Sequence, residues 1–291
     1  MESPSSNKRY SGRFFSRQEI EQIRELLRAD PGASRQQVSY RVCEVFDWRK
    51  PDGSLKDMSC RVALLRMHRE GLIELPAPRR RVKPCGSFAR RTAQAEPEPL
   101  LEAPVHELEG LRLALVERKV SALWNEYVDR YPYLGYKPLA GAQLRYFAYD
   151  GDRLLGLLGF GAAAWQTAPR DQWIGWSAAQ RQRNLSAVVN NARFVILPWI
   201  RVASLASKLL SMVCRELPQA WEERYGYRPV LLETFVEAER FAGTCYRAAN
   251  WRCLGHTQGR GKLGDHRIGQ VPIKAVWVYP LVREFRERLC R

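Results

Sequence analysis

Three side chains in the C-terminal half could take part in acid–base or nucleophilic chemistry. Glu233 ends an apolar run over 230–232, the place where open α/β sheets present ligands. Cys245 and Tyr246 lie on a predicted helix over 239–249, and a thiolate or phenolate can attack phosphorus or an acyl carbon once a neighbour lowers its pKa. Each also has a structural interpretation: a strand-end cap or ion pair for Glu233, and packing for Cys245 and Tyr246.

A second group of polar side chains could bind nucleic acid. Asn190, Asn191 and Arg193 precede an apolar strand, and amides and a guanidinium can bind a phosphate or a base edge, although adjacent asparagines are also common in turns. We expect Glu233, Tyr246 and Arg260 to share one cleft with the two asparagines at its rim, because a strand, the helix after it and the next loop can converge.

The cofactor is left open. His256, Asp265 and His266 suggest a divalent metal, but a ten-residue spacing on a loop is weak evidence. The seven cysteines include no C-x-x-C pair, so we expect reduced thiols rather than a zinc or redox centre.

The elements that position these residues indicate a mixed α/β domain over 110–291. Strands over 144–149 and 154–160 flank Asp150-Gly151-Asp152, which predicts a hairpin. Further predicted elements are a helix over 111–128, a polar helix over 177–186, strands over 193–197, 230–234 and 275–279, and helices over 204–216 and 239–249. Because strands alternate with helices after the hairpin, we expect a mixed sheet.

Residues 1–92 predict a helix-turn-helix/winged-helix module with a basic tail. Ser16 with Glu19 forms a capping-box pattern before a helix over 16–28, Ser34 caps a second helix that buries Val38, Val42, Val45 and Phe46, and helix 57–70 precedes a short strand over 72–76. The third helix would enter the major groove of duplex DNA. The residues expected to face nucleic acid in this module are Arg35, Gln36, Lys56, Ser59 and Arg61, with Arg66 as a further candidate. A helical packing or dimerisation module is the alternative.

Charge separates the chain into three parts. The net charge is +16, made of +9 over 1–92, −5 over 93–109 and +12 over 110–291. The acidic, Pro-rich stretch 93–109 predicts an extended linker between two domains. The cations of Arg79, Arg80 and Arg81 could neutralise backbone phosphates, so nucleic acid is the first partner to consider, and a solubilising surface is the alternative.

Tryptophans near cations add a further possibility. Trp173 and Trp176 lie beside Arg170, Arg181 and Arg183 and could stack on unpaired bases, whereas most of the nine tryptophans are expected to pack in the core. The N-terminus has no apolar signal region and no run has the length of a membrane span, so we expect a cytoplasmic protein.

The order helix, hairpin, strand, helix, strand, helix, strand resembles the GNAT-like acyl-CoA N-acyltransferase fold. That family carries an R/Q-x-x-G-x-G/A loop at a helix N-terminus, where backbone N–H groups hold a pyrophosphate. Arg201 and Ala206 match this pattern and Ser204 replaces the glycine, so the resemblance implies a coenzyme A site whose close backbone approach a side chain hinders. The segment 246–255 resembles the closing helix-to-strand part, in which a Tyr can protonate a thiolate leaving group.

A closer resemblance covers nearly the whole chain. The segments Arg35-Gln-Gln-Val-Ser, Asn190-Asn-Ala-Arg-Phe-Val-Ile-Leu-Pro198, Leu232-Glu-Thr-Phe-Val236, Phe241-Ala-Gly-Thr-Cys-Tyr-Arg-Ala-Ala-Asn-Trp251 and Gly259-Arg-Gly261 are similar to the DruA family of Druantia anti-phage systems. Domains of this type also occur beside or fused to transposases, so the resemblance implies phage defence or mobile DNA.

Two functional hypotheses follow. In the first, a DNA-binding defence or mobile-element protein recognises or processes nucleic-acid strands with its second domain, for example as a nuclease or strand-transfer enzyme. In the second, an acyl-CoA-dependent N-acyltransferase is targeted to DNA by the first domain. The sequence leaves open whether the chain is an enzyme, as well as its partner subunits.

Overall fold

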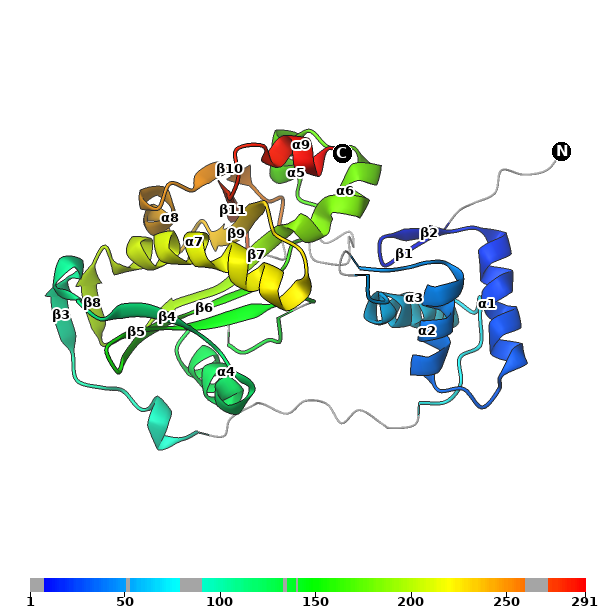
Figure 1. Ribbon diagram of the computed structural model, residues 1–291, viewed down its shortest axis with the longest axis horizontal. Helices are drawn as coiled ribbons and strands as arrows, with labels where there is room; N and C mark the ends of the chain where they lie inside the picture. The colour runs from blue at the N-terminus through cyan, green and yellow to red at the C-terminus, as the bar shows by residue number, and fades with distance from the viewer. Residues whose placement is uncertain (1–7, 51–52, 79–90, 133–134, 140, 260–271) are drawn as a thin grey trace. The chain divides into compact units, whose positions relative to one another are not determined.

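The chain forms two compact units, Met1–Gly86 and Ser87–Arg291, in a computed structural model. The model describes residues 8–50, 53–78, 91–132, 135–139, 141–259 and 272–291 (Figure 1).

The first unit is a hairpin followed by three helices. Strands β1 (Lys8–Tyr10) and β2 (Arg13–Phe15) pair antiparallel, and α1 (Arg17–Ala29), α2 (Arg35–Val45) and α3 (Asp57–Arg69) follow. Ser16 and Ser34 both form capping boxes, with Glu19 and Gln37 as the reciprocal partners. The three predicted helices are therefore confirmed.

The winged-helix prediction is not confirmed. Residues 72–76 form no strand, and the hairpin precedes the helices instead of following them. Arg24 Nε donates to the carbonyl of Leu72 and Arg35 Nε to that of Pro76, both at 2.7 Å, so side chains bind backbone groups that a neighbouring strand would have paired. Val45, expected to be buried, is 55% exposed.

The second unit contains a seven-stranded mixed sheet in the order β10-β11-β9-β7-β6-β5-β4. In chain order the strands are β4 (Leu111–Leu115), β5 (Leu144–Asp150), β6 (Arg153–Ala162), β7 (Val188–Ile196), β9 (Leu231–Glu237), β10 (Arg252–His256) and β11 (Lys274–Pro280). Within this sheet, as far as the chain is described, β7 and β9 are the one parallel pair. The mixed α/β prediction is confirmed.

Helices cover the sheet on both faces. They are α4 (Ser121–Arg130), α5 (Ala168–Ile174), α6 (Ala178–Asn184), α7 (Leu205–Tyr225), α8 (Thr244–Ala248) and α9 (Phe285–Leu289), with short 3-10 turns at Ala93–Ala95, Val105–Glu107, Arg118–Val120 and Leu185–Ala187. Figure 1 shows α7 and α4 on opposite faces, and α5, α6 and α9 gathered at one end of the unit. The helix predicted over 111–128 is wrong, because its first part is the edge strand β4.

The acidic segment 93–109 belongs to the second unit rather than standing between the two. Within it, β3 (Leu101–Pro104) pairs in parallel with β8 (Ile200–Ala203). The phenol groups of Tyr127 and Tyr131 donate to the carbonyls of Gln94 and Ala95. Ala95 is completely buried, so this stretch is held by backbone and side-chain contacts that its composition does not show.

Candidate functional site

The sheet opens where β7 and β9 part. These strands pair only from Val188 to Asn190 with Leu231 to Glu233, and beyond that point their backbones are no longer in register as a ladder. Diverging carboxyl ends of parallel strands are where α/β sheets bind ligands. The predicted residues Asn190, Asn191, Glu233 and Tyr246 all lie near this point.

Glu233 is fully buried and fully paired. Its carboxylate accepts from Arg170 Nη1 and from the backbone N–H of Ala164, each at 2.7 Å. Arg170, which is buried as completely, also binds the Asp171 carboxylate at 2.7 Å, and Asp171 contacts Arg181 at 3.3 Å. Burial raises the pKa of Glu233, an effect that the Arg170 guanidinium opposes. The carboxylate therefore anchors the α5 segment to the sheet.

Tyr246 lies in an aromatic cluster. Its hydroxyl donates to Asn191 Oδ1 at 2.9 Å, and its ring centroid is 5.2 Å from that of Trp251 and 6.3 Å from that of Trp277. Tyr246 is only 7% exposed, and burial raises its pKa. The backbone of Gly243 lies directly against the Trp277 ring. Its φ is 69°, and a Cβ atom at this position would lie 2.7 Å from that ring, so a larger residue does not fit. These rings pack against one another beside β9.

The predicted shared cleft is wrong, because Glu233 and Tyr246 lie on opposite faces of the sheet. Thr234 is the neighbour of Glu233 on β9, so its side chain points to the other face. Thr234 Oγ1 donates to the Asn191 carbonyl at 2.9 Å, on the side of Tyr246. Arg260, the third member of the expected cluster, lies outside the described residues.

The adjacent asparagines are also separated by the sheet. Asn190 is paired in register with Glu233 and shares its face, whereas Asn191 bonds to Tyr246. A β-bulge follows, since Gly159 pairs with Arg193 and Phe160 with Asn191, which leaves Ala192 as the extra residue. Arg193 therefore points to the face of α4, where its Cβ and the Trp124 ring both lie against Gly159.

Cys245 has no feature of an activated nucleophile. Burial raises the pKa of its thiol, which keeps the sulfur protonated at neutral pH. A catalytic role for Cys245 would have required a neighbour that lowers this pKa, and the alternative interpretation was packing. The described residues contain no cluster of three His, Cys, Asp or Glu side chains able to hold a metal ion. Asp265 and His266 are outside the described residues.

The predicted phosphate loop has a backbone suited to glycine. Arg201 lies on β8, and Ser204 is the N-cap of the 21-residue helix α7 with φ 61°, in the left-handed region. The Ser204 side chain makes no capping hydrogen bond, so it does not bind the first backbone N–H groups of α7. Ser204 thus keeps the conformation of the glycine it replaces and adds a side chain.

The predicted nucleic-acid residues of the first unit have different surroundings. Arg35 binds the Pro76 carbonyl, Gln36 donates to Tyr40 at 2.7 Å, and Arg61 pairs with Asp57 at 2.6 Å. Burial lowers the pKa of Lys56, the N-cap of α3, and nearby Lys50 lowers it further. Ser59 is half-buried. Arg79, Arg80 and Arg81 lie outside the described residues.

An exposed stripe on α3 contains Arg66, which the sequence suggested, and three residues that sequence reasoning missed. Met58, Val62, Arg66 and Arg69 follow at helical spacing; Met58 is 61% and Val62 44% exposed, and both arginines are exposed. In the part of the chain that the structure describes, neither arginine has a carboxylate within ion-pair distance. The i, i+4 spacing of 58, 62 and 66 was the available signal. We call these four residues the α3 stripe.

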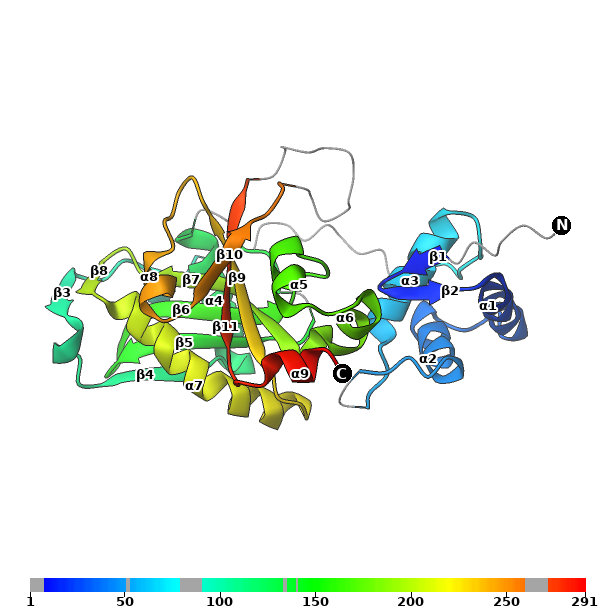
Figure 2. The ribbon, with the colours of Figure 1, turned by 90° about the horizontal axis from the view of Figure 1, so that it is seen from above.

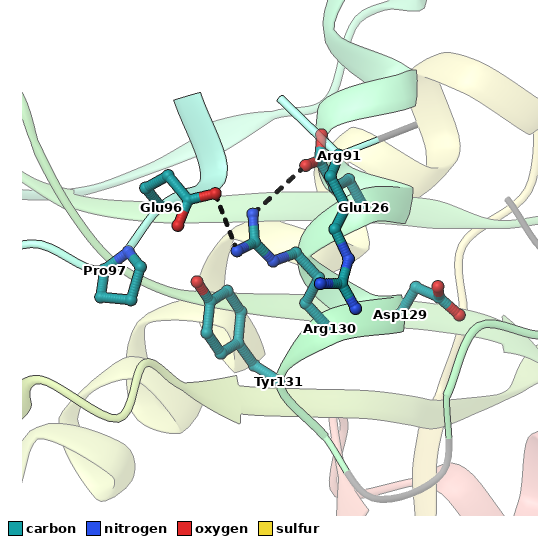
Figure 3. A pocket seen from close by; sticks show the side chains of 7 residues that line it. All are labelled: Arg91, Glu96, Pro97, Glu126, Asp129, Arg130 and Tyr131. Carbon is teal, nitrogen blue, oxygen red and sulfur yellow. Dashed lines mark hydrogen bonds and ion pairs between the residues drawn. The ribbon is translucent and has the colours of Figure 1, made fainter. Parts of the chain in front are cut away.

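A polar pocket lies where the docked acidic segment meets α4. It has a volume of about 350 Å³ and is lined by Arg91, Glu96, Pro97, Glu126, Asp129, Arg130 and Tyr131 (Figure 3). Glu126 accepts from the backbone N–H and hydroxyl of Thr92 at 2.6 and 2.8 Å, and Arg130 binds Glu96 at 3.0 Å. The charged groups of Glu126, Arg130 and Glu96 therefore hold the acidic segment 93–109 against α4.

No helix of the described residues has the length and apolar character needed to cross a membrane.

Comparison with protein families gives one match: the family model of Druantia protein DruA matches residues 66–268. No match was found among curated proteins.

The solved structures that are similar include a Bacillus subtilis acetyltransferase in complex with CoA, with 11% identity, 59% of this chain and 99% of that chain covered, and a TM-score of 0.35. Arabidopsis thaliana Naa50 with a bisubstrate analogue has 11% identity, 58% and 98% coverage, and a TM-score of 0.38. A GNAT-family acetyltransferase from Streptococcus pneumoniae has 14% identity, 58% and 99% coverage, and a TM-score of 0.38. The GNAT-like order of elements expected for the second unit is present in its sheet.

Proposed function

This chain belongs to the family of Druantia protein DruA, and we propose from that membership that it binds duplex DNA as part of phage defence. The observation that carries the proposal is the α3 stripe. Two exposed apolar side chains and two guanidinium groups without carboxylate partners among the described residues lie along one helix face.

The chemistry of the α3 stripe suits the major groove. Guanidinium groups donate in pairs to guanine, and apolar side chains contact the thymine methyl group. Burying Met58 and Val62 against DNA would remove apolar surface that the folded chain leaves in water. If the arginines of this helix served only to keep the surface soluble, the exposed Met58 and Val62 beside them would have no explanation.

The N-terminal end of α3 supports the same orientation. Lys50 and Lys56 are close enough for Lys50 to lower the pKa of Lys56, so a phosphate between them would relieve this repulsion. The first N–H groups of a helix also favour an anion. Backbone phosphate contacts at this end would fix the position of the helix while the α3 stripe contacts bases.

The proposal is limited to binding. Of the residues expected to process strands, Glu233 and Tyr246 are buried and Cys245 is half-buried, and Glu233 and Tyr246 lie on opposite faces of the sheet. These positions offer no common site for a scissile phosphate.

Binding of a labelled 20-base-pair duplex to the full chain, measured by fluorescence anisotropy over a salt series, tests this proposal. R66A/R69A should weaken binding at least tenfold and leave the log–log salt slope nearly unchanged, because these guanidinium groups are proposed to contact bases and the slope counts phosphate contacts. R17A/R118A removes two exposed guanidinium groups elsewhere and should change affinity less than twofold.

Two results would contradict the proposal: no duplex binding by the unmodified chain at low salt, or equal losses in both double variants. Cells that carry the complete defence system offer a second measurement. There R66A/R69A should lose protection in a plaque assay, and R17A/R118A should keep it.

A second candidate, coenzyme A binding, is favoured by one observation. Ser204 has the left-handed backbone that a glycine would adopt before the N-terminus of α7. Tyr246 argues against acyl transfer at such a site, because this predicted acid is buried and its hydroxyl is bound to Asn191. A rise in melting temperature with acetyl-CoA that S204G increases would support this candidate, and no rise at millimolar acetyl-CoA would exclude it.

A further inference from the structure

Aromatic and cationic side chains of α5, α9 and β10 gather at one place in the second unit. Trp173 of α5 stacks on Phe285 of α9, with ring centroids 4.8 Å apart and planes 17° from parallel. The guanidinium groups of Arg286 and Arg252 lie 4.7 and 5.9 Å from the Trp173 centroid. Figures 1 and 2 show α5 next to β10, and the stacking of Trp173 on Phe285 brings α9 to the same place. We call Trp173, Arg252, Phe285 and Arg286 the end platform.

Core packing accounts for Phe285, which is buried, and for part of Trp173, but not for the two arginines. Trp173 is half-buried, while Arg252 and Arg286 are exposed. Within the described residues, neither arginine has a carboxylate partner, and Arg286 Nε instead donates to the Trp173 carbonyl at 3.2 Å. Trp176, by contrast, is buried and donates to Asp171, so of the two tryptophans only Trp173 keeps an exposed part.

Charge around the end platform favours a polyanion. Arg283 and Arg288 are also exposed on the same C-terminal segment as Arg286, and both lack a carboxylate partner among the described residues. Glu284 and Glu287 offset part of this charge. The guanidinium groups therefore outnumber the carboxylates in this segment, and two of them lie beside the Trp173 ring. Cations can bind the phosphates of a strand while an aromatic ring stacks on a base.

We propose that the end platform binds single-stranded DNA. The faces of bases are covered by their neighbours in a duplex and become accessible only in an unpaired strand, where they stack on aromatic rings and guanidinium planes. The α3 stripe, in contrast, offers groups for base edges in a groove. This inference deepens the proposed function, since it adds an unpaired strand to the duplex as a ligand.

The test measures binding of the full chain to a fluorescein-labelled 20-mer of thymidine and to a strand of equal length with abasic sites in place of the bases. R252A/R286A should weaken thymidine 20-mer binding about tenfold. R118A/R215A, a control that removes two exposed guanidinium groups at η3 (Arg118–Val120) and on α7, should change it less than twofold.

Arg252→Lys separates stacking from charge, because lysine keeps the charge and loses the plane. The unmodified chain should bind the thymidine strand more tightly than the abasic strand, and R252K should reduce that difference while leaving the salt slope unchanged. Equal affinity of the unmodified chain for both strands would overturn the proposal, as would equal losses in R252A/R286A and R118A/R215A.

The experiments can distinguish failure of the end platform from failure of the duplex site on α3. R66A/R69A should lose duplex binding and keep thymidine-strand binding, and R252A/R286A should show the reverse. If the unmodified chain binds no duplex but shows the expected strand pattern, the duplex proposal fails and the end platform stands. A shared loss of both ligands in R252A/R286A alone would overturn the assignment to single strands.

Discussion

Replacing Arg170 with methionine should destabilise the second unit more than any surface change. The side chain is completely buried, and it connects Glu233 on β9, Asp171 on α5 and the carbonyl of Ala164. Methionine has a similar length and leaves the Glu233 carboxylate with the N–H of Ala164 as its remaining partner within the described chain. A buried carboxylate without its cation is unfavourable.

The expected loss is about 3–5 kcal/mol, the usual cost of removing one partner of a buried ion pair. For a unit of 150–250 residues, this corresponds to a melting temperature lower by roughly 6–20 °C. R153M is the matched control, because Arg153 pairs with Glu98 at 3.5 Å with both side chains partly exposed. Such a pair contributes below about 1 kcal/mol.

The effect should depend on pH in a definite direction. Burial already raises the pKa of Glu233 above its ordinary value of 4.5, and loss of Arg170 raises it further. Because the folded state then binds the proton more tightly than the unfolded state, stability is greatest at low pH and falls as pH rises through the folded pKa, by about 1.4 kcal/mol per unit. R170M should therefore melt closest to the unmodified chain near pH 5.

Thermal unfolding followed by tryptophan fluorescence from pH 5 to 8 measures both effects. The double variant R170M/E233Q, which has no carboxylate at position 233, should lose the additional pH dependence. A loss in R170M below about 1 kcal/mol, equal to that of R153M, would refute the view that this pair anchors α5. A pH-independent loss would refute the part of the argument that concerns Glu233.

Three further substitutions test separate contacts by thermal unfolding. Tyr246→Phe should cost about 1–3 kcal/mol, because Asn191 Oδ1 loses its buried donor; it should leave duplex binding unchanged, and a loss of DNA binding in a folded variant would restore a functional role to the hydroxyl. Ser16→Ala should cost about 1 kcal/mol through the capping box of α1, and an unchanged melting temperature of the first unit would contradict the cap geometry. Gly243→Ala should cost more than about 1–2 kcal/mol, since the left-handed backbone is unfavourable and the new Cβ would lie 2.7 Å from Trp277; a neutral effect would mean that α8 can shift.

The helices of the first unit could be predicted because their signals are local. Ser16 and Ser34 each act on residues three positions away, and the apolar periodicity of a helix is visible within one window. The strand expected over 72–76 shows the limit of such signals. Its alternating apolar residues do face the core, but Arg24 and Arg35 supply its hydrogen bonds from distant positions.

The candidate site could not be predicted because its contacts are long-range. Glu233 was correctly placed on a strand, yet its partner Arg170 is 63 positions away on a segment between β6 and β7. Because Arg170 and Ala164 of that segment bind Glu233, the carboxylate is buried instead of facing a cleft. The face on which Tyr246 lies was equally hidden, because it depends on how α8 packs and not on spacing along the chain.

The single extra residue in β7 makes this strand intolerant of changes in length. Removing Ala192 would take out the bulge, and Asn191 and Arg193 would become direct neighbours. Consecutive residues of a regular strand point to opposite faces, so everything on one side of the deletion would have to move by one position or turn over. Either Asn191 would leave Tyr246 or Arg193 would leave the face of α4. Substitutions at position 192 should thus be accepted far more readily than a deletion or insertion there.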